Sequence, residues 1–401
     1  MANVSSSNGL EKRPRLAFRN TDGSHFPCWR QTSLGCIIEP YSEKVYGEHD
    51  YEVLTSAREG LQRQEDHFGS KQRHDTDGYN IIPFGYCTYR NRSDDGKFAF
   101  NINTISEKAI VSKFYPVFRF TNANSTFMAE FLNSSPRVKK KLSVLAVGTS
   151  QVVLSFEALK AAKFDLPCKD EQDKIAAFLE CLNARIENQR TLVVALKKYK
   201  RGLLSQLIAQ KKAFDTSGEW KTVKLGHIFK ERTERAKGNE TLLAVTISNG
   251  VQRRDEIDLK DNSSDDKSNY KCVYIGDIAY NTMRMWQGAS GVSPYNGIVS
   301  PAYTIVTPIR PDLHNMTFWA YYFKYSPLVQ TFQKYSQGLT SDTWNLKFPQ
   351  FSEIAVTMPP ISEQDKIAEC LSVFDEHCKC EDEKLQALLQ VRTSLLQQLF
   401  I

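Results

Sequence analysis

The sequence of 401 residues has no long apolar run, no secretory signal and no regular cysteine framework. No stretch approaches the roughly 18 to 20 consecutive apolar residues that a membrane-spanning helix needs. The first residues, MANVSSSNGLEKRPR, lack the apolar core of a secretory signal. The nine cysteines are odd in number and show no Cys-x-x-Cys spacing, which argues against a disulfide framework or a zinc site. These absences predict a cytoplasmic protein without a bound metal.

Sequence motifs of nucleotide-binding and methyl-transferring enzymes are also missing. The chain contains no Gly-x-x-x-x-Gly-Lys-Ser/Thr phosphate loop and no Gly-x-Gly-x-x-Gly run. It has no Asn-Pro-Pro-Tyr motif of adenine methyltransferases, because MPPI at 358–361 lacks both the Asn or Asp and the aromatic residue. We therefore expect a non-catalytic protein without a cofactor.

The sequence does contain a slight excess of positive charge and an internal repeat. A net charge of +6 permits a nucleic-acid partner without requiring one. The hexapeptide EQDKIA occurs at 171–176 and again at 363–368. A shift of 192 residues places 171–209 on 363–401 with 13 of 39 positions identical. The chain therefore reads as a tandem duplication, in which each half has about 150 divergent residues followed by about 40 similar ones.

The two similar segments have the apolar spacing of long helices. Apolar residues recur at alternating steps of four and three, which is the pattern of a coiled-coil seam. Each helix would be ~60 Å long at a rise of about 1.5 Å per residue. Charge favours pairing of the two, since 171–213 carry nine Lys or Arg and four Asp or Glu, whereas 363–401 carry four and eight. The alternative is that each helix packs only on its own domain.

Polar residues interrupt both seams and predict a register for the pair. The first seam is interrupted at Gln189 and Lys200, and the second at Glu381 and Arg392. A single antiparallel register can place Gln189 against Arg392 and Lys200 against Glu381. Polar residues in such seams fix register at some cost in stability.

The divergent segments combine strand and helix patterns. Short apolar runs such as LAVTIS at 243–248 read as strands, and residues 125–145 and 316–336 have helical patterns. The predicted fold class is α+β, with two pseudo-symmetric α/β domains joined by two long helices that pair as an antiparallel coiled coil. The predicted divisions are an N-terminal segment at 1–26, a first domain at 27–168, a central helix at 169–213, a second domain at 214–360 and a C-terminal helix at 361–401.

Several stretches resemble a known family. EQDKIAAFLECLNARIENQRTLVVALKKYKRGLLSQL and MPPISEQDKIAECLSVFDEHCKCEDEKLQALLQVRTSLLQQLF look like the two conserved regions of type I restriction-modification specificity (S) subunits. GEWKTVKLGHIFKERTER and YIGDIAYNTMRMWQGASGVSPYNGIVSPAYTIV resemble the beginning and the middle of their target recognition domains. FPCWRQTSLGCII in the first half fits the same beginning, so the resemblance covers nearly the whole chain.

The resemblance implies a sequence-specific DNA-recognition subunit of a type I restriction-modification complex. Each target recognition domain would read one half of a bipartite, asymmetric target in double-stranded DNA, while the helices set the spacing. The helices would also dock two methyltransferase subunits and, through the complex, the motor and restriction subunits. Two alternatives stay open: a specificity subunit of another restriction or modification-only system, or a coiled-coil protein scaffold without DNA readout.

Candidate DNA-contacting residues follow from base and phosphate chemistry. Arg favours guanine, Asn and Gln favour adenine, and Lys and Arg bind phosphate. Residues 89–97 and 281–297 combine such side chains with glycine. The candidates are Arg90, Arg92, Lys97, Arg253, Arg254, Arg284, Gln287 and Asn296. A surface ion pair is the alternative for Arg284, and the neighbouring Met285 and Trp286 are expected in the core.

Overall fold

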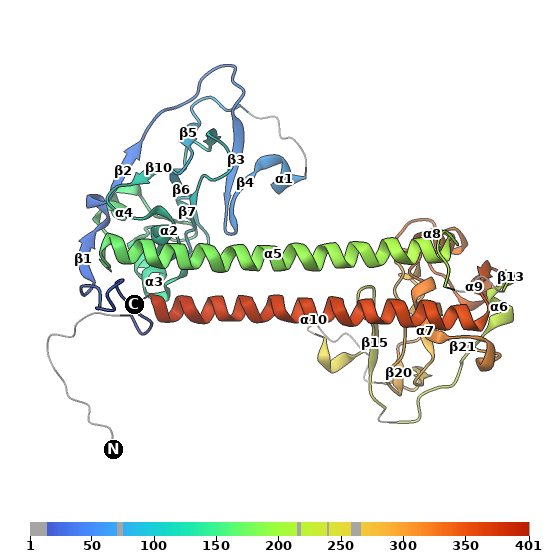
Figure 1. Ribbon diagram of the computed structural model, residues 1–401. Helices are drawn as coiled ribbons and strands as arrows, with labels where there is room; N and C mark the ends of the chain where they lie inside the picture. Colours follow the sequence, from blue (N-terminus) through green and yellow to red (C-terminus); the bar gives the residue numbers. More distant parts are fainter. Residues whose placement is uncertain (1–13, 70–74, 215–217, 239, 258–265, 401) are drawn as a thin grey trace. The chain divides into compact units, whose positions relative to one another are not determined.

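The computed structural model describes residues 14–69, 75–214, 218–238, 240–257 and 266–400 (Figure 1). It divides into two compact units, residues 1–189 with 384–401, and residues 190–383. Residues 1–13 and 401, which belong to the predicted N-terminal segment and C-terminal helix, lie outside the described residues. Each unit contains one divergent segment together with parts of both long helices.

The first unit is built from small sheets with short helices packed on them. Its strands are β1 (Arg30–Ser33), β2 (Ile38–Tyr41), β3 (Glu52–Ala57), β4 (Gly60–Arg63), β5 (Asn80–Pro83), β6 (Cys87–Tyr89), β7 (Arg92–Ser93), β8 (Phe100–Ile102), β9 (Lys108–Val111), β10 (Val117–Phe120), β11 (Val152–Val153) and β12 (Lys163–Leu166). Its short helices are α1 (Gln64–Phe68), α2 (Ser125–Ser134), α3 (Pro136–Leu145) and α4 (Phe156–Ala161). The strand orders are β2-β10-β6-β8, β4-β3-β9-β5, β1-β12 and β11-β7.

The second unit repeats much of this arrangement. Its strands are β13 (Lys221–Lys224), β14 (Phe229–Glu231), β15 (Leu243–Thr246), β16 (Gly250–Arg253), β17 (Lys271–Val273), β18 (Ile278–Asn281), β19 (Ser290–Val292), β20 (Gly297–Val299), β21 (Tyr303–Pro308) and β22 (Ala355–Met358). Its short helices are α6 (Leu225–Ile228), α7 (Met316–Tyr322), α8 (Ser326–Tyr335) and α9 (Phe348–Ser352). The sheet order β14-β21-β18-β19 corresponds to β2-β10-β6-β8, and the pair β13-β22 corresponds to β1-β12.

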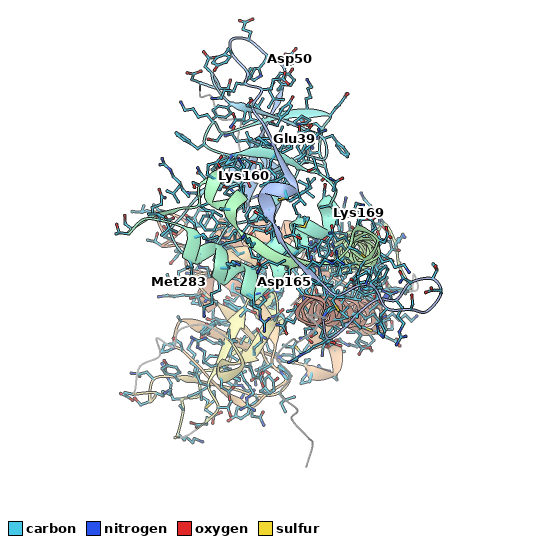
Figure 2. The ribbon with its side chains drawn as sticks, turned by 90° about the vertical axis from the view of Figure 1, so that its left-hand side faces the viewer. Glu39, Asp50, Lys160, Asp165, Lys169 and Met283 are labelled. Atoms are coloured by element: carbon cyan, nitrogen blue, oxygen red, sulfur yellow. The ribbon has the colours of Figure 1, made fainter. Side chains whose placement is uncertain are left out.

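Two long helices contribute to the cores of both units. They are α5 (Lys169–Ile208), with 40 residues, and α10 (Ile361–Leu399), with 39. In the first unit Ile175 and Leu179 of α5 join Leu396 and Leu399 of α10 in one buried cluster with α2. Figure 1 shows α2 beside α5, whereas β5 lies on the side of this unit away from that helix. Figure 2 likewise shows Asp50 far from Lys169, where α5 begins.

The second unit buries the opposite ends of the same helices. Leu204 and Leu207 of α5 cluster there with Ile367 and Leu371 of α10 and with Trp319 of α7. Full burial of a side chain of this size contributes roughly 1.5 to 3 kcal/mol. In the first unit early residues of α5 meet late residues of α10, and in the second unit late residues of α5 meet early residues of α10, so the helices run antiparallel. The predicted fold class is therefore confirmed.

The predicted register of the helix pair was wrong. Lys200 pairs with Asp375, which lies six residues before the predicted partner Glu381. Arg392 donates a hydrogen bond of 2.7 Å from its Nε to Asn183 Oδ1, whereas Gln189 was its predicted partner. The prediction matched polar seam positions only with one another, whereas each of these cations also contacts a residue of the adjoining domain. That third partner was not visible in the seam pattern.

The EQDKIA repeat ties each long helix to its own domain. In the first unit the Gln172 side chain accepts a hydrogen bond from the Asn124 backbone N–H at 2.9 Å and donates one to Pro167 O at 3.0 Å. The Asn124 side chain donates to Asp173 at 2.7 Å and caps α2 by accepting from the Phe127 N–H at 3.0 Å. A hydrogen bond from Lys169, which is the larger cause, and the one from Asn124 lower the pKa of Asp173 below its ordinary value.

The second unit repeats this junction with the corresponding residues. Gln364 accepts from the Asn315 N–H at 3.0 Å and donates to Pro359 O at 2.9 Å. Asn315 donates to Asp365 at 2.7 Å and caps α7 through the Phe318 N–H at 3.0 Å. In each half, residues of the hexapeptide therefore position a short helix of the domain on the start of a long helix.

Candidate nucleic-acid interface

The loop at 90–97 follows β6 in the first unit and includes the short strand β7. Arg90 and Arg92 are exposed, and β7 is held by pairing with β11, where Arg92 lies opposite Val153. The Leu154 N–H also donates to Asn91 O at 2.9 Å. The structure thus brings Arg90 and Arg92 together on a supported, solvent-facing loop.

Lys97, the third candidate of this loop, is occupied by a local carboxylate. Its ammonium lies 3.5 Å from Asp95, which also pairs with Arg58 at 2.8 Å. A hydrogen bond from the Ser93 hydroxyl is the largest cause that lowers the pKa of Asp95 to about 2, and Arg58 adds to it. Asp95 therefore stays ionised at neutral pH, and Lys97 stabilises the loop rather than adding free positive charge.

The loop at 282–289 has the corresponding place in the second unit, between β18 and β19. Arg284 is exposed, and its side chain forms no ion pair with the residues that the structure describes. Gln287 is half-buried at the end of the 3-10 turn Met285–Gln287. Met285 is fully buried, as expected, whereas Trp286 is only partly buried and packs edge-on against Trp344 with ring centroids 5.2 Å apart.

The Lys324 side chain holds this loop in place through hydrogen bonds to backbone carbonyls. Its ammonium donates hydrogen bonds to Gly288 O, at the end of the loop, and to Ile247 O, in the turn between β15 and β16, the latter at 3.1 Å. Burial, reinforced by the charge of Lys200, lowers the pKa of Lys324 to about 8. This partly buried cation was not among the predicted site residues, since nothing local in the sequence distinguishes it from a surface lysine.

The other candidates lie apart from this loop or have internal partners. Arg253 pairs with Asp255 at 2.7 Å and with Glu256 at 3.7 Å, so nearby carboxylates compensate its charge. Arg253 and Arg254 border a cavity of about 920 Å³ that Lys237 also lines. Asn296 accepts a hydrogen bond from the Ile275 N–H at 2.9 Å, which gives it a role in holding a turn.

A second loop supports the candidate loop in each unit and was missed by the sequence reasoning. In the first unit Val147 and Val153 exchange backbone hydrogen bonds, and in the second Gln337 and Asn345 do the same. The Leu346 N–H donates to Thr282 O at 2.9 Å, as Leu154 does to Asn91. The signal was present, because a shift of 191 residues places Thr149-Ser150 on Thr340-Ser341.

Neither a metal-binding cluster nor a membrane-spanning helix is found among the residues that the structure describes. Within the described ranges, no group of three or more His, Cys, Asp or Glu is arranged to hold a metal ion. Cys378 is buried in α10 while Cys380, two residues on, is exposed. Among the helices of the described residues, none combines the length and the apolar character needed to cross a membrane.

The chain is similar to solved structures over nearly its full length. The S subunit of a type I restriction-modification system from M. genitalium is 16% identical, with a TM-score of 0.57 over 97% of this chain and 99% of that one. A chain from a structure of type I R-M complex assembly and conformational transition is 16% identical, with a TM-score of 0.55 over 93% and 97%. The HsdS subunit from Thermoanaerobacter tengcongensis is 17% identical, with a TM-score of 0.48 over 93% and 96%.

A family comparison matches both halves of the sequence. Residues 40–196 and 217–390 each match the family described as Type I restriction modification DNA specificity domain. These two stretches cover most of the chain and coincide with the duplication found in the sequence. The chain therefore belongs to the type I restriction modification DNA specificity domain family and carries two copies of that domain.

Proposed function

We propose that each unit of this specificity subunit reads one half of a bipartite, asymmetric target in double-stranded DNA. The observation that carries this proposal is the pair of corresponding loops, 90–97 and 282–289, which lie at equivalent places on the same strand framework. Their side chains differ, with Arg90 and Arg92 in one and Arg284 and Gln287 in the other. A shared framework supports the same mode of approach to DNA, and different side chains support two different half-sites.

The long helices supply the remaining functions in this proposal. Because α5 and α10 contribute to both units, they would set the spacing between the half-sites. Their pseudo-symmetric sequences would offer two equivalent docking surfaces, one for each of two methyltransferase subunits. Restriction and motor subunits would join through that complex. The proposed divisions are those expected from the sequence, with recognition domains at 27–168 and 214–360.

The chain itself is proposed to be non-catalytic. The purified chain should neither methylate nor cleave DNA, because the chemistry would belong to the partner subunits. A radiolabelled S-adenosylmethionine assay with the isolated chain tests this, and methyl transfer by the chain alone would overturn it. A salt-dependent shift of random duplex DNA separates DNA reading from a protein scaffold, since phosphate contacts release counterions.

The decisive experiment is methylome sequencing of the host with and without this gene. A bipartite methylated motif should disappear with the gene. Exchanging residues 27–166 for another recognition domain should then change one half of that motif and leave the other half intact. If both halves changed, the two units would not read independently.

A further inference from the structure

The turn between β9 and β10 carries an exposed aromatic side chain on a firmly held backbone. Phe114 lies in this turn with 52% of its surface exposed. The Tyr115 N–H donates to Ser112 O at 2.9 Å, which closes the turn. The Asn80 side chain, from β5, donates to Tyr115 O at 2.9 Å and to Lys113 O at 3.4 Å. The turn is therefore fixed in shape while its largest apolar side chain faces solvent.

Three cations gather at this turn. The Arg92 guanidinium lies 5.2 Å from the Phe114 ring centroid, and the Lys113 ammonium lies 5.8 Å from it. Both distances are within the range of cation–π attraction. Arg90 is close enough to Tyr115 that its charge opposes the rise in the pKa of Tyr115 that burial causes. Phe114 thus joins the candidate loop 90–97 to the β9–β10 turn.

These charges have no carboxylate partner among the residues of the first unit that the structure describes. Among residues 14–69 and 75–214, neither Arg90 nor Arg92 nor Lys113 forms an ion pair with Asp or Glu, in contrast to Lys97 beside Asp95. A half-exposed aromatic ring flanked by uncompensated cations contributes little to the stability of the fold, because solvent weakens the contacts of the ring and of the cations. The same arrangement suits a polyanion whose bases offer apolar surface.

We propose that Phe114 and Lys113 are DNA-contacting residues of the first unit, with the ring against a base in the groove and the lysine on a flanking phosphate. This inference rests on the proposed function and names further residues for it. The flanking cations neutralise phosphates and fix the register of the unit on the duplex. The ring can recognise a base through apolar contact, as with the thymine methyl group in the major groove.

Phe84 provides a matched control in the same unit. It is also a phenylalanine in a turn, between β5 and β6, and it is 60% exposed. Among the described residues no Lys or Arg lies over its ring, whereas two lie over Phe114. Removing either ring removes a similar amount of exposed apolar surface, so only a DNA-contacting role would separate the two variants.

The test compares Phe114→Ala, Lys113→Ala and Phe84→Ala in the full chain. Fluorescence anisotropy with a labelled random-sequence duplex, over a series of KCl concentrations, gives the salt dependence of binding. Lys113→Ala should reduce the log–log slope by about one, the value for one lost phosphate contact. Phe114→Ala should leave the slope unchanged, and Phe84→Ala should behave like the wild type.

Sequence specificity provides the second readout, from methylomes of hosts that carry each variant. Phe114→Ala should relax one base pair in the half-site read by the first unit, by roughly 5- to 100-fold in discrimination, and leave the other half-site unchanged. Phe114→Tyr and Lys113→Arg should retain wild-type behaviour. The inference is overturned if Phe114→Ala and Lys113→Ala both match the wild type, or if Phe84→Ala loses as much as Phe114→Ala. The proposed function fails separately, if the wild-type chain itself shows no bipartite methylation and no salt-dependent binding.

Discussion

Arg392 on α10 donates a hydrogen bond from Nε to Asn183 Oδ1 on α5 at 2.7 Å, and from Nη2 to Glu130 on α2 at 2.5 Å. One guanidinium thereby ties both long helices to the first domain. Lys200, which precedes Arg392 by 192 residues, does the same in the second unit through Asp375 on α10 and the ring of Tyr321 on α7. The two units share a junction at equivalent positions but build it from different side chains.

Removal of the Arg392 cation should destabilise the first unit. Its side chain is 27% exposed and that of Glu130 is 17% exposed, so Arg392→Gln would leave a largely buried carboxylate without its cationic partner. We expect a loss of roughly 1 to 3 kcal/mol in the free energy of unfolding. Trp29 is the single tryptophan in the sequence of this unit, so ¹⁹F NMR of the 5-fluorotryptophan-labelled chain can follow its unfolding in urea.

A surface pair of the same unit supplies the control for this measurement. Arg119 and Glu39 lie 2.7 Å apart with side chains that are 50% and 52% exposed. Arg119→Gln should cost less than about 1 kcal/mol, because solvent screens the pair. A double-mutant cycle of Arg392→Gln with Glu130→Gln measures the coupling directly. Equal losses from Arg392→Gln and Arg119→Gln would show that the junction contributes no more than a surface pair.

Titration of Lys324 should make the stability of the second unit depend on pH. The unfolded chain holds this proton up to the ordinary pKa of 10.5, whereas the folded chain releases it near 8. Between these values the unfolded state binds more protons, so stability rises with pH across the window and is unaffected by this group below it. Relative to Lys324→Gln, the wild type should gain at most about 3 kcal/mol. Urea unfolding of both chains at several pH values checks this, and a constant difference would contradict it.

Two glycines should be required for the hairpins that support the candidate loops. Gly148 has φ +143° and Gly338 has φ +136°, and an added Cβ would meet Gln151 O at 2.2 Å and Thr343 O at 2.5 Å. Gly148→Ala or Gly338→Ala should cost roughly 1 to 3 kcal/mol and weaken recognition of one half-site. Gly202→Ala in α5 is the control, since no atom lies within 4 Å of the new Cβ. This control substitution should leave the free energy of unfolding unchanged or raise it by up to about 1 kcal/mol. Thermal unfolding and host methylomes provide the two readouts.

Loss of the asparagine cap should weaken the attachment of a domain to its long helix. Asn124→Ala removes both the cap of α2 and the hydrogen bond to Asp173, so we expect a loss of about 1 to 2 kcal/mol in the first unit. Ser155→Ala removes the cap of α4, which makes no such link to α5, and should cost less. Chemical denaturation measures the loss in the free energy of unfolding for each variant. Identical losses would argue against a role for Asn124 beyond capping.

The sequence predicts the helices and the duplication better than it predicts the contacts of single side chains. The seam spacing identified α5 and α10, because a period of 3.5 residues repeats over the whole length of each helix. The compensation of Arg253 by Asp255, and of Lys97 by Asp95, could also have been inferred, since each carboxylate lies only two residues away. The repeat itself contained the signal for the supporting hairpins.

Other contacts depend on the tertiary fold alone. Arg392 and Glu130 are 262 residues apart, so no local pattern relates them. Lys324 becomes distinctive only when its ammonium is enclosed near two backbone carbonyls. The turn that carries Phe114 approaches Arg92 because β10 pairs with β6 in one sheet, and its sequence, SKFYP, gives no sign of that neighbour.

The asparagine junction limits which foreign domains can be grafted onto this chain. Gln172 and Asp173 belong to the helix and stay behind in any exchange of residues 27–166, while Asn124 leaves with the excised domain. A donor domain must therefore bring its own asparagine at the start of the corresponding helix, together with an acceptor that can meet Arg392. A graft without them would retain its own fold and its own base contacts, yet it would be held at an undefined angle on the helix. Compatibility at these few positions, rather than overall sequence similarity, would decide which recombinants acquire a new target.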